Sequence, residues 1–282
     1  MMKYFEFLSF LLFNSLYYST LSLAIQYSCA CDHSLLLLAF KESLNIKQYS
    51  SNPLHYSSPC PKTMSWNKST NFYNWDEVTC DKITSNVINL DLSYSELDGS
   101  IDSNSSLFRQ SHLRRLNLAL NYLRGSQISM IFEHLSPAKL EPLRLIGNLQ
   151  LCGLLLSVRW NSYRTLEWLD LSDIKFLGEI PDSIGNIKAL KYLNLLYCGF
   201  SGTIKSAMLL SLSSLQGLQL SKNQLSGSVP KELSSLVNLW FLYLDNNKLS
   251  RPVPKELLSL VHLESIYLQS NNFSGHVDVG IF

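Results

Sequence analysis

The sequence carries almost no net charge. Lys and Arg total 23 and Asp and Glu total 22, which leaves a formal net charge of +1. A chain so balanced has no broad field to attract nucleic acid phosphates or an anionic membrane. It also lacks a cluster of basic residues with interleaved aromatics, which nucleic-acid-binding surfaces need. We therefore exclude nucleic acid as a partner.

The patterns that mark enzymes and metal sites are missing as well. The histidines share no metal-ligand spacing, and the cysteines do not form two close pairs of the kind that binds zinc. There is no glycine-rich phosphate loop and no Ser/His/Asp signature. Asp170 and Asp173 are close in sequence, but no histidine or nucleophile accompanies them, so we interpret them as surface residues. The sequence predicts a protein that is not an enzyme, with no cofactor, metal or small-molecule substrate.

One long apolar stretch is present, and it lies at the start of the chain. Lys3 is followed by the run Phe7–Phe13, and Ser22-Leu-Ala24 places small residues where a signal peptidase reads them. Polar residues interrupt the stretch, so it falls short of the ~20 apolar residues that a spanning helix needs. Residues 1–24 are predicted to be a signal peptide. As written, the chain is expected to be secreted, or to lie on the extracellular side of the plasma membrane if the native product continues beyond Phe282.

Export gives meaning to the cysteines and to the glycosylation sequons. In an oxidising compartment the cysteines of the first third can pair, and these disulfide candidates are Cys29, Cys31, Cys60 and Cys80. Cys152 and Cys198 lie far apart and are expected to be unpaired. An acceptor asparagine must lie on the surface, and the three sequons predict glycans at Asn67, Asn104 and Asn272.

Most of the chain is a repeat. The pattern Leu-x-x-Leu-x-Leu-x-x-Asn-x-Leu-x-Gly fits residues 215–227 in full, and close variants fit seven more segments. The second apolar anchor of each unit lies 24 to 27 residues from the next, at Leu90, Leu116, Leu143, Leu169, Leu193, Leu218, Leu242 and Ile266. Repetition with such a period indicates a solenoid, in which each unit buries its apolar face against its neighbours.

The motif itself predicts local structure. Leu-x-Leu has the period of two that a short strand needs, so we expect eight strands to stack in parallel into one concave sheet. The Asn should satisfy backbone groups of neighbouring turns that no strand pairing reaches. Cys198 and Ile174 occupy this Asn position in their units, and we interpret Cys198 as structural. Ile-Pro and Val-Pro pairs should begin an extended segment that leads to the convex side.

These repeats resemble the plant extracellular class of leucine-rich repeats because they end in Leu-x-Gly-x-Ile/Val-Pro. The block before them, which includes residues 32–41, Ser65-Trp66-Asn67 and residues 75–81, looks like the N-terminal cap of plant receptor-like proteins, especially the disease-resistance type of nightshades. The resemblance implies an α/β solenoid, a right-handed superhelix with one concave parallel sheet. It divides the chain into residues 1–24, a helical and hairpin cap over 25–86, and about eight repeats over 87–282.

The chain also departs from this family. Phe72 and Tyr73 stand where the family's cap has paired cysteines, so Cys29 and Cys80 lose the partners that the resemblance implies, and any bridge must be rewired. We expect a weakened cap. The repeats reach Phe282 without a C-terminal cap, which favours a truncated receptor ectodomain.

The resemblance implies a sensor of peptide or protein ligands in plant defence or development, with a membrane-bound co-receptor of the same repeat class as a second partner. The alternatives are a secreted inhibitor similar to the plant polygalacturonase inhibitors and a receptor fragment without function. On a strand, the residues beside and between the core leucines point away from the core. This places a candidate binding surface on the concave face, at Asp91, Arg115, Asn117, Arg144, Trp168, Asp170, Tyr192, Asn194, Gln219, Phe241, Tyr243 and Tyr267. The large aromatics among them are the expected anchors.

Overall fold

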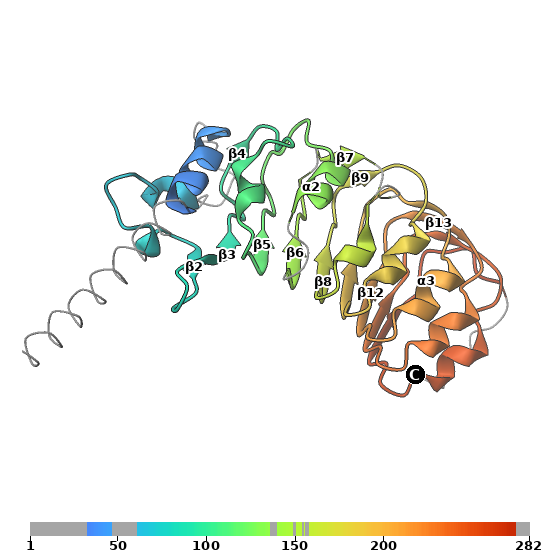
Figure 1. Cartoon of the computed structure of the whole chain (residues 1–282). Coiled ribbons are helices and arrows are strands. Elements are labelled where there is room, and N and C mark those ends of the chain that lie inside the picture. The colour runs from blue at the N-terminus through green and yellow to red at the C-terminus, as the bar shows by residue number, and fades with distance from the viewer. Residues whose placement is uncertain are drawn as a thin grey trace, which may run out of the picture.

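The structure is a computed structural model that describes residues 33–46, 61–135, 140–148, 151–153, 155 and 158–274. The predicted signal peptide lies outside the described residues, as do Cys29, Cys31 and Cys60. The described part forms a curved solenoid with the cap at one end (Figure 1). The described helices are all too short or too polar to cross a bilayer.

The concave face is one sheet, to which the described residues contribute nine strands in the order β16-β14-β12-β10-β8-β6-β5-β3-β2. Eight of them are parallel, one from each repeat, as the leucine spacing predicts. β2 (Val78–Cys80) pairs antiparallel with β3 and supplies the hairpin of the cap. The parallel strands are β3 (Val87–Asp91), β5 (Arg115–Asn117), β6 (Pro142–Arg144), β8 (Trp168–Asp170), β10 (Tyr192–Asn194), β12 (Gly217–Gln219), β14 (Phe241–Tyr243) and β16 (Ser265–Tyr267).

Each parallel strand contains the first apolar residue of its Leu-x-Leu pair, and the second follows directly after the strand. Both side chains of the pair face the core. Leu218 and Leu220 are fully buried, as are Leu242 and Leu244 one unit later. In register, Leu193 lies beside Leu218 and Leu218 beside Leu242. The leucines therefore stack from unit to unit into one continuous core, and apolar area removed from water is the main stabilising contribution.

A ladder of buried asparagines ties neighbouring units together, as the motif predicts. The Nδ2 of Asn223 donates to the carbonyl oxygens of Leu195 (2.8 Å) and Leu220 (3.0 Å). Its Oδ1 accepts from the backbone N–H groups of Cys198 (3.1 Å) and Phe200 (3.0 Å). The same arrangement recurs at Asn121, while Asn247 and Asn271 make the equivalent bonds with one backbone N–H group on Oδ1 instead of two. Side chains thus satisfy buried backbone groups that the sheet does not reach.

Three units replace this asparagine, with Ser95, Ile174 and Cys198 at the ladder position. The Cys198 thiol donates to the carbonyl oxygen of Leu171 (3.1 Å) and is 1% exposed, which confirms its structural role. Ile174 is fully buried and offers no hydrogen bond at its position. The residue before the ladder position has a left-handed backbone in unit after unit, with φ between 54° and 57° at Leu120, Asp173, Tyr197, Lys222, Asn246 and Ser270.

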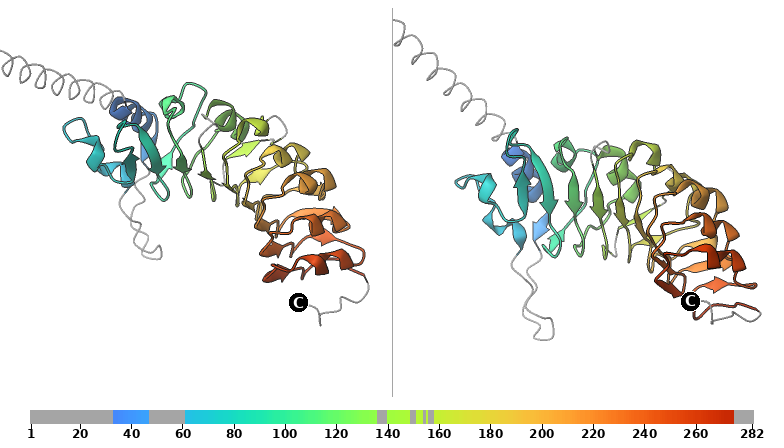
Figure 2. Two further views of the ribbon diagram at one scale, coloured as in Figure 1. Left: turned by 60° about the horizontal axis from the view of Figure 1, so that its bottom comes forward. Right: turned by 90° about the horizontal axis from the view of Figure 1, so that it is seen from below.

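The convex side is covered by short helices that differ from unit to unit (Figure 2). Pro181, Pro230 and Pro254 have extended backbone and begin η6, η7 and η8, which confirms the expected role of the Ile-Pro and Val-Pro pairs. The described helices on this side are η3 (Ser106–Arg109), α2 (Ile128–His134), η5 (Trp160–Ser162), η6 (Asp182–Asn186), α3 (Ser206–Ser211), η7 (Lys231–Ser235) and η8 (Lys255–Ser259).

Smaller sheets form where the chain leaves the concave face, and the sequence predicted only extended segments there. β11 (Ser201–Thr203), β13 (Gln224–Gly227) and β15 (Lys248–Leu249) pair in parallel. β7 (Cys152–Gly153) pairs with β9 (Lys175–Phe176), and β1 (Asn45–Ile46) pairs antiparallel with β4 (Leu97–Asp98). The β1–β4 pair joins the cap to the first repeat.

The cap contains a helix, which is described over residues 33–42, and the short helices η1 (Lys62–Ser65) and η2 (Phe72–Asn74). Phe72 is 4% exposed and packs edge-on against Trp75, with ring centroids 6.2 Å apart. Trp75 also stacks on Trp66 at 5.4 Å. A buried aromatic cluster therefore occupies the region where the family's paired cysteines were expected.

Cys80 is a free thiol in this structure, and its three candidate partners lie outside the described residues, so a rewired disulfide in the cap stays a prediction. It is half-buried, and this burial raises the pKa of its thiol to about 11. A thiol with so high a pKa is a poor nucleophile. The three predicted glycan acceptors are exposed, at Asn67, Asn104 and Asn272.

Candidate ligand-binding surface

The parallel register sorts the concave side chains into two rows that run across the strands. Residues just before the central leucine form the first row, because each lies beside its counterpart on the next strand. Its members are Asn89, Arg115, Pro142, Trp168, Tyr192, Gly217, Phe241 and Ser265. Residues just after that leucine form the second row, which consists of Asp91, Asn117, Arg144, Asp170, Asn194, Gln219, Tyr243 and Tyr267. All twelve concave residues expected from the sequence therefore lie on this face.

The predicted aromatics meet in a continuous line, which we call the aromatic row and which consists of Trp168, Tyr192, Phe241, Tyr243 and Tyr267. The ring centroids of Trp168 and Tyr192 are 4.3 Å apart, and those of Tyr243 and Tyr267 are 4.5 Å apart. Phe241 joins the two pairs, at 6.1 Å from Tyr192 and 5.2 Å from Tyr243. The first four rings are half-buried and Tyr267 is 48% exposed. The row presents a nearly unbroken aromatic surface to solvent.

The row is continuous because Gly217 has no side chain. A Cβ at Gly217 would lie 2.1 Å from Cζ of Phe241, so the Phe241 ring lies over the backbone of β12. In this position the ring reaches back towards Tyr192, two strands away. Phe241 was expected on this face from the sequence, whereas the role of Gly217 was not. The available signal was a glycine at a row position that carries a larger side chain in the other repeats.

Several polar residues of the second row are already engaged by the backbone. Oδ1 of Asn194 accepts from the N–H of Leu196 (3.1 Å), and Oε1 of Gln219 accepts from the N–H of Ser221 (2.8 Å). Oδ1 of Asp170 accepts from both the N–H (3.1 Å) and the hydroxyl (2.7 Å) of Ser172. Asp170 is also 8% exposed. The expectation that Asp170 is an open contact for a ligand therefore needs correction, because its carboxylate is buried and bonded to Ser172 just after β8.

Asp91 is engaged as well, and it links the cap to the first repeat. Its carboxylate accepts from Lys62 Nζ (2.9 Å), from the Ser93 hydroxyl (2.6 Å) and from Asn117 Nδ2 (3.0 Å). Burial alone would raise the pKa of Asp91, but these hydrogen bonds outweigh it and hold the pKa at about 2. Asp91 therefore stays charged and paired at neutral pH.

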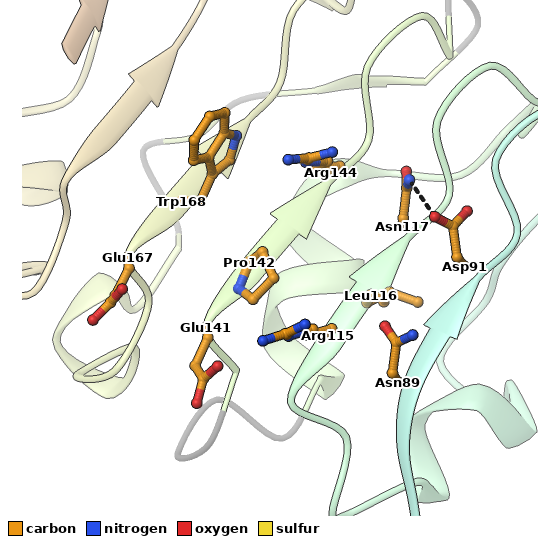
Figure 3. A pocket seen from close by; sticks show the side chains of 10 residues that line it. All are labelled: Asn89, Asp91, Arg115, Leu116, Asn117, Glu141, Pro142, Arg144, Glu167 and Trp168. Carbon is orange, nitrogen blue, oxygen red and sulfur yellow. Dashed lines mark hydrogen bonds between the residues drawn. The ribbon is translucent and has the colours of Figure 1, made fainter. Parts of the chain in front are cut away.

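Next to the aromatic row the face is hollowed into a depression of about 460 Å³ over β3, β5, β6 and β8 (Figure 3). Trp168 forms one wall, and the Arg144 guanidinium carbon lies 5.0 Å from the centroid of its ring. Arg115 and Glu141 line the lower part beside Pro142. Glu167 pairs with Lys191 at 2.9 Å. Arg115 and Arg144 are exposed, and within the described part of the chain no carboxylate lies at ion-pair distance from either.

Two acidic residues lie at the end of β8, which Asp170 closes and Asp173 follows three residues later. Burial, and then the charge of Asp170, raise the pKa of Asp173, so the two carboxylates interact. The nearby Cys198 thiol has its pKa raised to about 12, chiefly by burial. Within the described ranges, three or more His, Cys, Asp or Glu side chains nowhere gather in a way that could hold a metal ion.

Comparisons with known proteins agree on one family. The sequence model described as Leucine rich repeat matches residues 198–249, and a second one of the same description matches residues 165–187. Receptor-like protein 9DC1 of Solanum pimpinellifolium is 33% identical over 239 residues, which are 80% of this chain and 26% of that protein. The chain thus spans about a quarter of the length of that relative.

Solved structures show the same solenoid. One is the ectodomain of the Arabidopsis thaliana receptor kinase GASSHO1/SCHENGEN3 in complex with CASPARIAN STRIP INTEGRITY FACTOR 2, with a TM-score of 0.69 and 26% identity over 87% of this chain and 30% of that one. Another is the Arabidopsis receptor kinase HAESA with the peptide hormone IDA and the co-receptor SERK1, with a TM-score of 0.64 and 29% identity over 87% of this chain and 42% of that one.

Proposed function

The chain belongs to the leucine-rich-repeat receptor-like proteins of plants, and we propose that it is an extracellular recognition module that binds a peptide or protein ligand across its concave face. The observation that carries this proposal is the aromatic row. Its five rings occupy positions that the core does not need, yet they are ordered against one another over five parallel strands. Ordered, half-exposed aromatics are the usual anchors of protein interfaces, because they bury a large area at little entropic cost.

The neighbouring structures support a peptide as the ligand and a second receptor as the partner. HAESA, which shares this fold, was solved with a peptide hormone and a co-receptor. By analogy, we propose that a membrane-bound co-receptor of the same repeat class joins this chain once its ligand is bound. A recognition role needs no catalytic group. Asp170 and Asp173 lie near the Cys198 thiol, and the raised pKa of that thiol makes it a poor nucleophile.

The test compares the binding of peptides to the wild-type chain and to variants that lack one ring of the aromatic row. The probe is a synthetic library of fluorescent octapeptides, which are long enough to cross the strands of the row, applied to purified chain from a plant host. We expect peptides that bind the wild type and lose affinity with Trp168→Ala or Tyr243→Ala. Truncating one anchor costs about 2 kcal/mol, or roughly 30-fold in Kd.

Tyr197→Ala is the matched control. Tyr197 is 60% exposed but lies in the turn after β10, outside the row, so its removal should leave Kd within about twofold. Circular dichroism checks that each variant keeps its fold. Peptides whose affinity falls as much with Tyr197→Ala as with Tyr243→Ala would place the binding surface elsewhere.

A further inference from the structure

The depression at the N-terminal end of the aromatic row has the chemistry of an anion subsite. We propose, on the basis of the recognition role above, that it binds a carboxylate of the peptide ligand through Arg144 and Arg115. The ligand is therefore an extended peptide with an acidic group at one end and apolar or aromatic residues along the rest.

Arg144 is the main carboxylate contact because its position is fixed while its donors are open. Its guanidinium carbon lies 5.0 Å from the Trp168 ring centroid, which is within the range of a cation–π contact. Arg144 lines the depression, and a guanidinium can donate two parallel hydrogen bonds to one carboxylate. The neighbours of Arg144 in register do not compete, since Asn117 donates to Asp91 and Asp170 is bonded to Ser172.

The charges around the depression leave a cationic excess. Asp91 is neutralised by Lys62, and Glu167 by Lys191. Glu141 is the one lining carboxylate without an ion pair among the described residues, against the two arginines. Glu141 lies beside Pro142 at the lower side, whereas Arg144 lies at the upper side next to Trp168 (Figure 3). The upper part of the depression, which adjoins the aromatic row, is therefore the part that attracts an anion.

The position of the subsite gives the ligand a minimum length. From β6, which carries Arg144, to β16, which carries Tyr267, there are five strand spacings. At ~4.8 Å each they span roughly 24 Å. An extended peptide covers ~3.3 Å per residue, so about seven residues reach from the carboxylate to the far end of the row.

The experiment uses two versions of an acetylated octapeptide library on the full chain, one amidated and one with a free C-terminus. In the amidated version we expect enrichment of Asp or Glu at one terminal position. If the free C-terminus supplies the carboxylate, binding instead requires the second version and no acidic side chain. Either result supports the subsite, because both place one carboxylate at one end of an apolar peptide.

Variants then assign the carboxylate to its partner. For a selected acidic peptide, Arg144→Gln should weaken Kd about tenfold and Arg115→Gln by less, while Arg109→Gln in η3 on the convex side should have no effect. Changing the peptide's acid to its amide should abolish the effect of Arg144→Gln, as expected for two groups that interact directly. Arg144→Lys keeps the charge but loses the planar stack, so its loss should be smaller than that of Arg144→Gln.

The two proposals fail in different ways. Peptides that depend on Tyr243 but show no acidic preference and no loss with Arg144→Gln would overturn the anion subsite and leave the recognition role standing. If no octapeptide binds the wild type better than it binds Tyr243→Ala, the recognition role fails and the subsite falls with it.

Discussion

Replacing one asparagine of the ladder should destabilise the solenoid far more than its single side chain suggests. In Asn223→Ala, the buried N–H groups of Cys198 and Phe200 lose their acceptor, and the carbonyl oxygen of Leu195 loses its donor. The Leu220 carbonyl keeps a partner, because Asn247 Nδ2 also donates to it at 2.9 Å. Each unsatisfied buried group costs ~1–3 kcal/mol, so the three groups together should lower the free energy of unfolding by at least about 3 kcal/mol.

Cys198→Ala is the internal control, since Cys198 occupies the equivalent position one unit earlier. It loses the weak hydrogen bonds from the thiol to the Leu171 and Leu196 carbonyls and a small volume. The expected loss is only about 1–2 kcal/mol. Urea unfolding followed by circular dichroism measures both. A difference of under about 1 kcal/mol between the two variants would refute the ladder as the device that satisfies the buried backbone.

Three further predictions follow from the concave face and the cap. Gly217→Ala should displace the Phe241 ring and break the row, weakening peptide binding about tenfold while changing stability by no more than about 1 kcal/mol, as titration and urea unfolding would show. Because the pKa of Asp91 is depressed to about 2, its contribution to the free energy of unfolding is present above about pH 4 and is lost as the pH falls towards 2. After solvent screening we expect this contribution to be about 1 kcal/mol. Unfolding measured at the two pH values should show the loss in the wild type and not in Asp91→Asn. If the chain is exported, enzymatic removal of N-glycans should lower its mass, and an unchanged mass would count against glycans at the exposed acceptors Asn67, Asn104 and Asn272.

The regular parts of the fold could be predicted from the sequence because each repeat carries the same leucine and asparagine pattern. The spacing of the leucines predicted all eight parallel strands, and the Asn position predicted the ladder, since both depend on a period that the chain repeats. The smaller sheets and the varied convex helices were not predicted in detail. They occupy the segments where the repeats differ in length and sequence, as at α2 (Ile128–His134).

The candidate site was predictable only in part. Alternation along a strand placed Trp168, Tyr192 and Tyr243 on the concave face without reference to any neighbour. By contrast, the place of Phe241 depends on Gly217 in the previous unit, and the burial of Asp170 depends on its bond to Ser172. Such cross-strand and turn contacts are set by packing in three dimensions, which a single repeat does not encode.

The most direct test of the concave recognition surface is a photo-cross-link from within it. Gln219 lies beside Tyr243 in register, in the middle of the aromatic row, and is replaced by p-benzoylphenylalanine. Leu210 in α3 on the convex side, 60% exposed, receives the same substitution as the control. With an octapeptide selected on the wild type, the account predicts a light-dependent cross-link at position 219 and none at 210, located by mass spectrometry. A cross-link at 210 and none at 219 would contradict it.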